Sequence, residues 1–418
     1  MSTPVASNTR YMRKVNAAAV LTELRRAKGK GVSVPELAHA TGLSRQAVTR
    51  ALSGLEKDGL VELLAPQRPV NRSGRPPQPV RFRAEAGHVL GVSITPDELH
   101  VAVADLNGTV VADRTTSAVH LDSAHVTELL TDTVVRTLSS AGLAPEHIWH
   151  ASLGTPGIVS QDTREVRFTP SMPHITGNVL LHTLQKHLSC PIHLDNDVKL
   201  ATEGERRREG HDRHKGPMVF VQWGERVGAG IVVFDRLYRG ASNDAGDLGF
   251  LDLCVEETGG ESQDPDLEGL GSFEAWVSSI RLIDLTRKSA LRTEDHTLTQ
   301  ALENADEAVE VVAEALRAGN PAATEALEEI TRRFARGLGA VRALLDPEVV
   351  VIGGPMATLG EPLLKALTGH LEHRRLNPPR LELSTREGDG VVQGALHHSL
   401  AEVERDVLAS PPTARFFS

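Results

Sequence analysis

The sequence predicts an α/β protein with an N-terminal winged helix-turn-helix domain followed by a larger body of two α/β lobes. Three observations predict this fold class. Residues 1–84 carry 15 Lys and Arg but only 5 Asp and Glu, whereas the other residues hold 30 basic and 50 acidic side chains. Short helical segments separated by glycine turns fill the basic part. Beyond it, hairpins and then alternating strands and helices occur twice.

Composition excludes several classes of protein. The chain has 418 residues, 40% of them hydrophobic, enough for two or three domains with a large core. Its two cysteines, Cys190 and Cys254, form no C-x-x-C pair, so neither a disulfide framework nor a structural zinc site is predicted. The longest apolar stretch, residues 227–234, is too short to cross a membrane, and no secretory signal is recognisable. We expect a cytoplasmic, nucleoid-associated protein.

Three helices are predicted in the basic part. The first covers residues 16–28. The second begins after Ser33, has Pro35 in its first turn and ends at Thr41-Gly42. The third has Ser44 as its N-cap and places its apolar side chains on one face. Those apolar residues are Val48, Ala51, Leu52 and Leu55. A helix, a glycine turn and a second helix are typical of the helix-turn-helix.

The polar face of the third helix predicts contacts with double-stranded DNA. Arg and Gln can bond base edges in the major groove, and Ser and Thr can reach phosphates or a thymine methyl group. The predicted contact residues are Ser44, Arg45, Gln46, Thr49 and Arg50. A basic, solvated face that never meets DNA is the alternative interpretation.

A wing is predicted after the third helix. Residues 60–64 form a strand candidate, and five prolines follow between Ala65 and Val80. Arg72 and Arg75 lie in this rigid basic stretch, where they could enter a minor groove. A proline-rich linker is the alternative.

The body is predicted as two α/β lobes. In the first lobe Asn107-Gly108 signals a hairpin turn. Its predicted strands are 88–94, 99–106, 109–113, one ending at 153, and 192–195, with helices at 124–141, 178–189 and after 197. The second lobe has strands at 219–223, 230–234 and 349–352, with helices at 303–319, 321–345 and 360–373, and a last helix is predicted at 391–408. The predicted domains are 1–84, 85–200 completed by a C-terminal helix at about 386–410, and 201–385.

Four motifs, in this order, resemble the ROK family (repressor, open reading frame, kinase). They are Gly154-Thr155-Pro156-Gly157, Asp195-Asn196-Asp197-Val198, the segment from Gly240 to Gly249, and the segment from Asp346 to Gly354. Members of that family are sugar-responsive repressors and sugar kinases. The resemblance covers nearly the whole chain and implies an actin-like ATPase (ribonuclease H-like) fold. The helix-turn-helix with Gly74-Arg75-Pro76 resembles the repressor branch, because the kinase branch lacks that domain.

The phosphate-binding segments depart from the kinase pattern. Where the kinases carry Asp-x-Gly-Gly-Thr, this chain has Thr95-Pro96-Asp97 after Ser93-Ile94. Where they carry Gly-Thr-Gly, it has Gly224-Glu225-Arg226. Added carboxylates and lost glycine amides oppose triphosphate binding. We therefore predict no catalytic residue, no kinase activity and no cofactor.

The resemblance implies a carbohydrate site in the cleft between the lobes. The residues carried over are Gly157, Asn196, Asp197, Asp247 and Glu268. Asp197 stands where the kinases have a general base, and several carboxylates suit a ligand with many hydroxyl donors. Asp247 replaces a glutamate and Phe250 a histidine, and the zinc-binding cysteine cluster is missing, so no metal is predicted.

Alternatives remain for this site. Asn196 and Asp197 are also good caps for the helix that begins there. Arg206-Arg207-Arg208 could neutralise a phosphate on a ligand or could be a solvated face.

The combined interpretation is a homo-oligomeric transcription regulator, a dimer or tetramer, that represses by binding operator DNA and responds to a sugar or sugar derivative. One alternative is a sugar kinase with an added DNA-binding head. Another is a DNA-binding regulator whose cleft no longer binds a small ligand.

Overall fold

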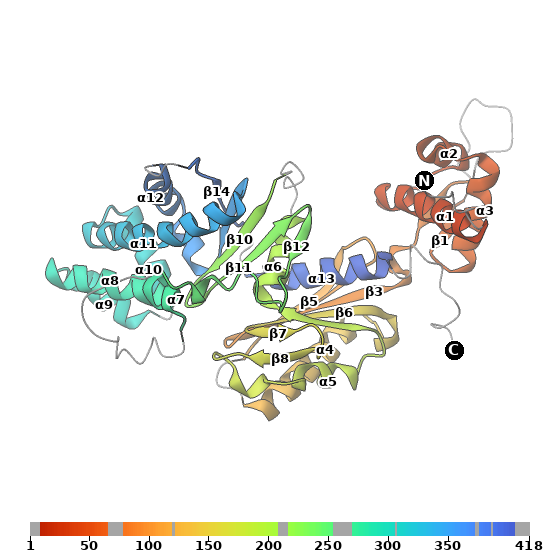
Figure 1. Ribbon diagram of the computed structural model, residues 1–418. Helices are drawn as coiled ribbons and strands as arrows, with labels where there is room; N and C mark the ends of the chain where they lie inside the picture. Colours follow the sequence, from red (N-terminus) through yellow and green to blue (C-terminus); the bar gives the residue numbers. More distant parts are fainter. Residues whose placement is uncertain are drawn as a thin grey trace. The chain divides into compact units, whose positions relative to one another are not determined.

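The computed structural model describes residues 9–65, 78–118, 122–207, 216–253, 270–305, 307–372, 376–385 and 388–405 (Figure 1). The chain divides into two compact units. Unit 1 holds residues 1–153, 179–193 and 395–418, and unit 2 holds residues 154–178 and 194–394. The predicted division at residue 84 falls within unit 1 and stays a prediction. None of the helices in the described ranges is long and apolar enough to cross a bilayer.

The head, residues 9–83, has the predicted three helices and a β-hairpin. Its helices are α1 (Thr9–Arg26), α2 (Val34–Thr41) and α3 (Arg45–Lys57), and its strands β1 (Val61–Leu63) and β2 (Val80–Phe82) pair antiparallel. The expected bounds of the first helix were wrong, because α1 already begins at Thr9 and ends at Arg26. Leu24, Leu37, Leu52 and Phe82 are among the buried side chains that join these elements.

Local caps fix the ends of α2. The Ser33 hydroxyl accepts from the Glu36 amide, and the Glu36 carboxylate accepts from the Ser33 amide at 2.8 Å, which completes a capping box. At the other end Gly42 has a φ of 69°, a left-handed conformation that glycine adopts without a steric penalty. The turn between α2 and α3 is therefore fixed by the local sequence.

The sheet that begins after the head has the strand order β5-β4-β3-β6-β9. Its strands are β3 (His88–Ile94), β4 (Glu98–Asp105), β5 (Val110–Ser117), β6 (Ile148–Thr155) and β9 (Ile192–Asn196). Every residue of β3 is buried, as expected of a central strand. Helix α4 (Ser123–Ser140) packs on β4, β5 and helix α5 (Val179–Gln185). Two small strands, β7 (Ile158–Ser160) and β8 (Glu165–Phe168), form a separate hairpin in unit 2.

The sheet of unit 2 has the order β12-β11-β10-β13-β14. Its strands are β10 (Met218–Trp223), β11 (Val227–Val233), β12 (Arg236–Tyr238), β13 (Val349–Gly353) and β14 (Arg380–Leu383). Strands β12, β11 and β10 run antiparallel, whereas β10, β13 and β14 run parallel. Sequence analysis missed both edge strands, β12 and β14.

Helices surround this second sheet. They are α6 (Asp197–Arg206), α7 (Ser272–Val277), α8 (Ser279–Arg292), α9 (His296–Asn304), α10 (Ala308–Arg317), α11 (Pro321–Leu345) and α12 (Glu361–Glu372), and α13 (Gly390–Val403) follows β14. The helix expected at 303–319 corresponds to α10, but its bounds were wrong, because α10 covers only Ala308–Arg317 and Asn304 belongs to α9. Helices α7, α8 and α9 were not predicted.

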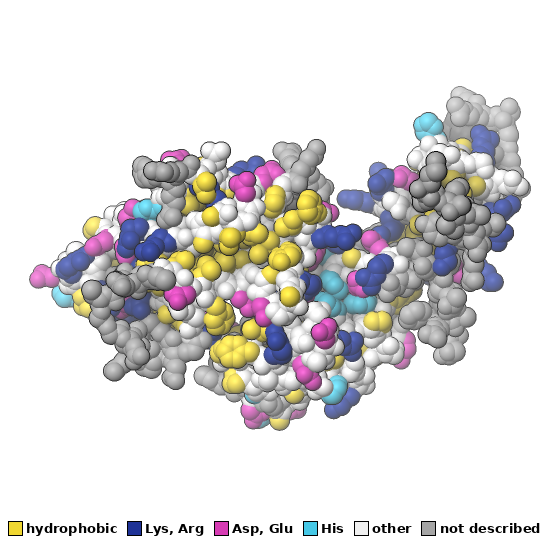
Figure 2. Space-filling model, in the orientation of Figure 1, with side chains coloured by type: hydrophobic (Ala, Val, Ile, Leu, Met, Phe, Trp, Pro, Cys, Tyr) yellow, Lys and Arg dark blue, Asp and Glu magenta, His cyan; other side chains and the backbone are white. Residues whose placement is uncertain are grey.

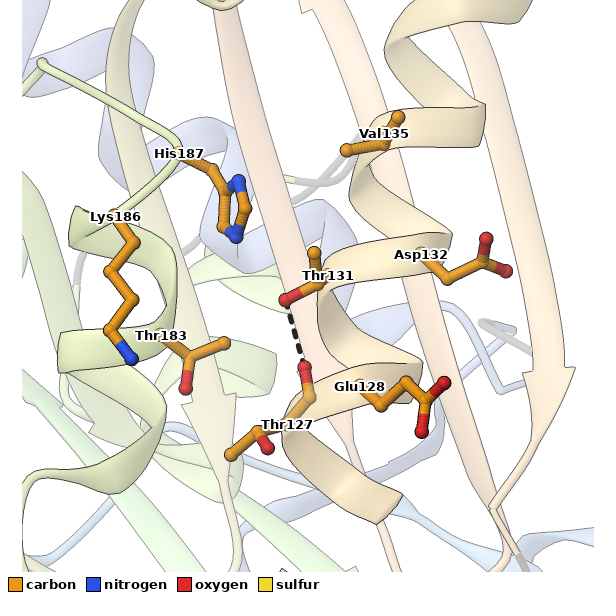
Figure 3. A pocket seen from close by; sticks show the side chains of 8 residues that line it. All are labelled: Thr127, Glu128, Thr131, Asp132, Val135, Thr183, Lys186 and His187. Atoms are coloured by element: carbon orange, nitrogen blue, oxygen red, sulfur yellow. Dashed lines mark hydrogen bonds between the residues drawn. The ribbon is translucent and has the colours of Figure 1, made fainter. Parts of the chain in front are cut away.

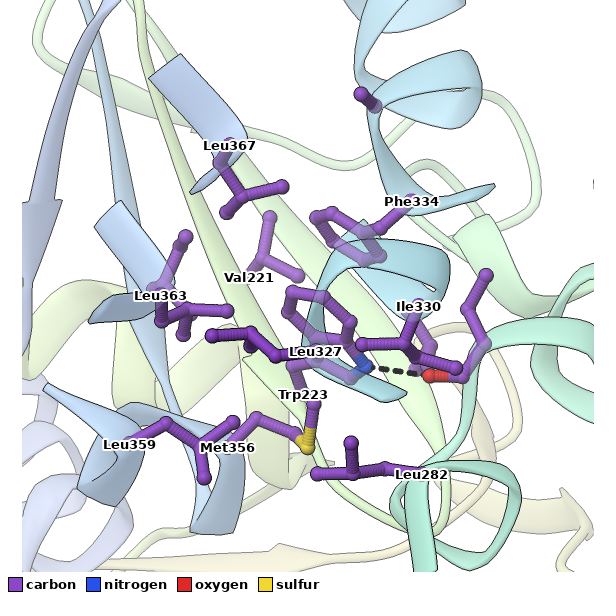
Figure 4. Close-up of a cluster of buried hydrophobic side chains, with 14 of the residues drawn as sticks. Val221, Trp223, Leu282, Leu327, Ile330, Phe334, Met356, Leu359, Leu363 and Leu367 are labelled. Atoms are coloured by element: carbon purple, nitrogen blue, oxygen red, sulfur yellow. Dashed lines mark hydrogen bonds between the residues drawn. The ribbon is translucent and has the colours of Figure 1, made fainter. Parts of the chain in front are cut away.

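Two stacked aromatic rings lie among the aliphatic side chains of the core of unit 2 (Figure 4). The rings of Trp223 and Phe334 are stacked with centroids 3.6 Å apart. The Trp223 indole nitrogen donates to the Val277 carbonyl at 2.7 Å, so the polar atom of this fully buried side chain is satisfied. This core joins β10 to α7 and α11, and it holds the end of β10 in place.

Candidate DNA-binding helix and carboxylate cluster

Helix α3 presents its polar side chains to solvent. The Ser44 hydroxyl accepts from the Ala47 amide at 3.2 Å, which confirms the predicted N-cap. Arg45, Gln46 and Arg50 are exposed, while the predicted apolar face is buried. Lys and Arg side chains are spread over the head on the face drawn in Figure 2. The arrangement suits a helix that enters a major groove, with its N-terminal residues toward base edges.

Two of the predicted contact residues, Ser44 and Thr49, already use their hydroxyl groups in hydrogen bonds with the backbone of α3. The Thr49 hydroxyl donates to the Arg45 carbonyl at 2.9 Å, which leaves the methyl group for a thymine contact. Ser44 uses its oxygen as an acceptor in the cap and retains its proton for a phosphate. The wing residues Arg72 and Arg75 lie outside the described residues, so their contacts with DNA stay predictions.

In unit 2 four of the five predicted carbohydrate-binding residues lie on segments joined by hydrogen bonds. Asn196 ends β9 and is the N-cap of α6. Its Oδ1 accepts from the Lys199 amide at 3.2 Å, and its Nδ2 donates to the Gly157 carbonyl at 2.9 Å and to Asp197 at 3.0 Å. The capping alternative is therefore confirmed for Asn196, and a ligand contact stays a prediction. Glu268 lies outside the described residues.

Asp197 is half-buried at the first position of α6. Its Oδ1 accepts from the Val198 amide at 2.8 Å. Burial raises the pKa of the Asp197 carboxyl to about 6, although this amide and the ammonium of Lys199 oppose the shift. Asp197 can therefore accept hydrogen bonds from ligand hydroxyls above that pH and carries a proton below it.

Gly157 has a φ of 96°, and a Cβ at this position would lie 2.1 Å from the Phe168 carbonyl oxygen. Only glycine fits there, so the backbone of Gly157 can approach Asn196 closely. A structural role is therefore sufficient to explain this glycine, whether or not a ligand touches it.

Asp247 precedes the short 3-10 turn Leu248–Phe250 and is half-buried. Burial raises the pKa of the Asp247 carboxyl, while the charge of Lys199 acts against this. Burial also lowers the pKa of Lys199, which is 3% exposed and donates to the Asn243 carbonyl. Lys199 thus connects α6 with the loop that carries Asp247.

Sequence analysis missed the polar residues that support these groups. Asp195 is fully buried and pairs with Arg239, with an N–O distance of 2.6 Å. Arg239 also donates to the Asn243 side chain at 3.0 Å, and Asn243 donates to the Val159 carbonyl at 2.8 Å. Asp195 lay within a quoted motif, but its partner Arg239 is partly exposed and 44 residues away in the chain, and no local pattern reveals the pair. We call Asp195, Asp197 and Asp247 the carboxylate cluster.

The β3–β4 turn engages its own amides. The Thr95 hydroxyl oxygen accepts from the Glu98 amide at 3.1 Å and from the Asp97 amide at 3.3 Å. Donors that could cradle a phosphate are therefore already occupied by Thr95.

The β10–β11 turn engages its amides too. The Gly224 amide donates to the Arg226 carbonyl at 3.0 Å. The Val227 amide donates at 3.0 Å to Glu274, a buried carboxylate that also lies 3.5 Å from the Arg226 guanidinium. The amides of this second potential phosphate loop are thus already hydrogen-bonded within the protein, and one of their acceptors is the carboxylate of Glu274.

An open groove of about 470 Å³ lies in unit 1 between α4 and α5 (Figure 3). The groove is lined by Thr127, Glu128, Thr131, Asp132, Val135, Thr183, Lys186 and His187. The hydroxyls of Thr127, Thr131 and Thr183 each donate to a backbone carbonyl of their own helix. None of the predicted site residues lines this groove. Within the described ranges no group of three or more His, Cys, Asp or Glu side chains could hold a metal ion.

Comparison with known proteins identifies the larger part of the chain. The model of the ROK family matches residues 89–398. The chain belongs to the ROK family. A model of the MarR family matches residues 14–69, which is the helix-turn-helix part of the head. The ROK repressor pattern predicted from sequence, a winged helix-turn-helix followed by an actin-like α/β fold, is thereby confirmed.

Relatives of this ROK protein include both regulators and kinases. A protein named xylose repressor from Caldicellulosiruptor bescii is 22% identical over 415 residues, which cover 97% of this chain and all of the relative. The crystal structure of a ROK family transcriptional regulator, described as a homologue of the Escherichia coli Mlc protein, matches 96% of this chain and all of that chain with a TM-score of 0.74 and 19% identity. A ROK family glucokinase from Streptomyces griseus, solved with glucose and AMPPNP, matches 75% of this chain and 99% of its own with a TM-score of 0.62 and 20% identity.

Proposed function

We propose that this protein is a cytoplasmic transcription regulator that represses by binding operator DNA through its head and is controlled by a carbohydrate at the carboxylate cluster. The exposed Arg45, Gln46 and Arg50 on a capped recognition helix, in a head joined to a ROK domain, carry the DNA-binding part. The wing residues Arg72 and Arg75 would add contacts in the minor groove. The name of the full-length xylose repressor relative supports the repressor role and nominates a pentose as the first effector to test.

The effector site is proposed from the carboxylate cluster and its neighbours. Asp195 is paired with Arg239, and Lys199 lies among the remaining carboxylates, so Asp197 and Asp247 are the acceptors left for ligand hydroxyls. Gly157 and Asn196 would border the ligand, and Glu268 would add a further acceptor. A neutral polyhydroxylated ligand suits such acceptors better than a phosphorylated one, because Asp197 and Asp247 would repel a phosphate.

We propose no kinase activity and therefore no nucleotide cofactor. The amides of the β3–β4 and β10–β11 turns bond within the protein, as described above. A sugar kinase with an added DNA-binding head is the rival function, favoured by the fold shared with the glucokinase. Millimolar ATP with magnesium should leave the melting temperature of this protein unchanged. A marked rise, with phosphate transfer to a sugar, would establish the rival.

The DNA-binding function is tested by fluorescence anisotropy with duplexes from the protein's own genome, at two salt concentrations. Specific duplexes should bind more tightly than random ones by about a thousandfold or more. A two-fold operator has half-sites about 34 Å apart, so we propose at least a dimer and test it by analytical ultracentrifugation. Equal affinity for specific and random duplexes would contradict the proposal.

A further inference from the structure

The side chain of Arg25 joins the head to two other parts of unit 1. Arg25 lies in the last turn of α1. Its Nη1 donates to Glu404, which follows α13, at 2.5 Å, and its Nη2 donates to the Leu106 carbonyl at 2.9 Å. The guanidinium carbon lies 5.9 Å from the centre of the Phe82 ring on β2. One cation thus contacts α1, β2, the turn after β4 and the end of α13.

The turn after β4, next to Arg25, contacts both the end of the head and helix α13. The Leu106 amide donates to the Ala84 carbonyl at 3.0 Å, which attaches the turn after β4 to the segment that leaves the head. A Cβ on Gly108 in the same turn would lie 3.3 Å from Leu400 of α13. The end of α13 therefore packs against this turn as well as pairing with Arg25.

The other end of α13 is bound closely to α6 within unit 2. A Cβ on Gly394 would lie 1.7 Å from the Leu200 carbonyl oxygen, and one on Gly204 would lie 2.7 Å from the Gly390 carbonyl oxygen. The two helix backbones touch with no side chain between them. A shift of α6 therefore moves the first turns of α13, because a contact between backbones cannot be absorbed by a change of rotamer.

Helix α13 is continuous from this contact to the ion pair. It has 14 residues, and it passes from unit 2 to unit 1 between Gly394 and Ala395. Helix α6 begins at Asp197, in the carboxylate cluster. Helix α13 therefore contacts α6 through its first turns in unit 2 and is followed directly by Glu404 in unit 1.

We propose that Arg25 and Glu404 form a latch that fixes the orientation of the head on unit 1 and lets α13 act on the head when α6 moves. The pair is partly exposed, with side-chain exposures of 23% and 45%, so it can open without unfolding the protein. The fixed orientation of the head requires only the Arg25–Glu404 pair, whereas the response of the head to a sugar also rests on the proposed function.

The latch is tested in the full chain without DNA or sugar. Spin labels at Glu56→Cys in α3 and Ser139→Cys in α4 report the distance distribution between head and first sheet, with Cys254→Ser to avoid a third label. Both labelled positions are exposed. Burial raises the pKa of the remaining Cys190 thiol to about 12, so it should react little. Electron–electron double resonance then gives the distribution.

Each latch variant has a matched control. Glu404→Gln is compared with Glu402→Gln, because Glu402 lies on the same helix end and pairs with Arg405. Arg25→Gln is compared with Arg26→Gln, because Arg26 pairs with Glu23 on its own helix. Loss of the latch should populate undocked heads roughly three- to tenfold more and broaden the distribution. The controls should keep the narrow distribution, and Arg25→Lys, which keeps a cation able to donate to Glu404 and to the Leu106 carbonyl, should stay closer to the parent protein than Arg25→Gln.

Identical distributions in the latch variants and in their controls would overturn the latch. The coupling is read separately, as the ratio of operator Kd with and without 10 mM D-xylose. This ratio should fall toward one in Glu404→Gln and stay as in the parent protein in Glu402→Gln. If D-xylose has no effect on the parent protein, the pentose assignment fails, while the distance measurement still decides the latch.

Discussion

The side-chain amide of Asn196 connects helix α6 to Gly157, because its oxygen and its nitrogen each form a hydrogen bond. Its amide oxygen accepts from the Lys199 amide at 3.2 Å, and its amide nitrogen donates to the Gly157 carbonyl at 2.9 Å. Asn is suited to this position because its side chain has both an acceptor and a donor. Asp and Ser are also good caps, but an ionised Asp has no donor and the side chain of Ser is shorter. The segment around Gly157 is thereby held against the start of the helix that carries Asp197.

The two functions of Asn196 can be separated by substitution. Asn196→Ser should keep the cap and lose the bond to Gly157, whereas Asn196→Ala should lose both. We expect Asn196→Ala to lower the free energy of unfolding by about 1 kcal/mol more than Asn196→Ser, since that is the usual value of a cap. Urea denaturation measures both. Equal stability of the two variants would show that the cap contributes nothing.

Asp197 predicts a pH dependence of stability. Its folded pKa of about 6 lies above the ordinary value of 3.8, so the folded protein retains a proton that the unfolded chain releases. The stability contributed by this group is full below about pH 4, falls as the pH rises to about 6, and is constant above. Asp197→Asn should flatten this part of the curve of unfolding free energy against pH. An unchanged curve would exclude the raised pKa.

The same carboxyl predicts a pH dependence of effector binding. Hydroxyl groups of a sugar donate to the carboxylate form, so binding should strengthen as the pH rises through about 6. Titration calorimetry with D-xylose at pH 5 and pH 7.5 measures this change. Asp197→Asn should bind more weakly at pH 7.5 and lose the difference between the two pH values. Asp284→Asn is the control, because Asp284 lies outside the carboxylate cluster and pairs with Arg281 and Lys288 on α8.

Much of the head could be predicted from sequence because its signals are local. Ser33 and Glu36 lie three residues apart and cap the same helix end, and Ser44 caps the next helix in the same way. Chain order also suffices for the five-stranded sheets, except for the short edge strands β12 and β14. Helices α7 and α8 were missed because the cues at Gly271 and Ser278 are single caps without a clear apolar period.

The support of the carboxylate cluster could not be predicted, because its partners are distant in sequence. Lys199 and Arg239 have no local feature that marks them as partners of buried polar groups, and their positions depend on how α6 meets the loop before Asp247. The same limit applies to Arg25 and Glu404, which are 379 residues apart. Ion pairs between residues far apart in the chain depend on the fold, so no periodic pattern in the sequence reveals them.

The recognition helix predicts distinct effects on DNA binding. Arg45→Ala or Gln46→Ala should cost about 1 to 3 kcal/mol of operator binding and relax base preference at one position. Glu56→Ala, exposed toward the other end of α3, should leave the preference unchanged. Arg75→Ala should weaken binding more evenly across sequences and reduce its salt dependence. Anisotropy with single-base variants of the operator measures these effects. A uniform loss in every variant, with lower melting temperatures, would indicate unfolding instead.

The contact between α6 and α13 predicts opposite effects of the same substitution at two helical glycines. Gly394→Ala places a methyl group 1.7 Å from the Leu200 carbonyl oxygen, and because backbone cannot give way easily we expect a loss of about 3 kcal/mol in unfolding free energy. Gly369→Ala in α12 meets no atom within 4 Å and should stabilise by about 0.5 to 1 kcal/mol, since alanine favours helix. Thermal and urea unfolding of the two variants measure this difference. A Gly394→Ala protein as stable as the parent would show that the helices can separate at low cost, and the rigid transmission from α6 to α13 would then be wrong.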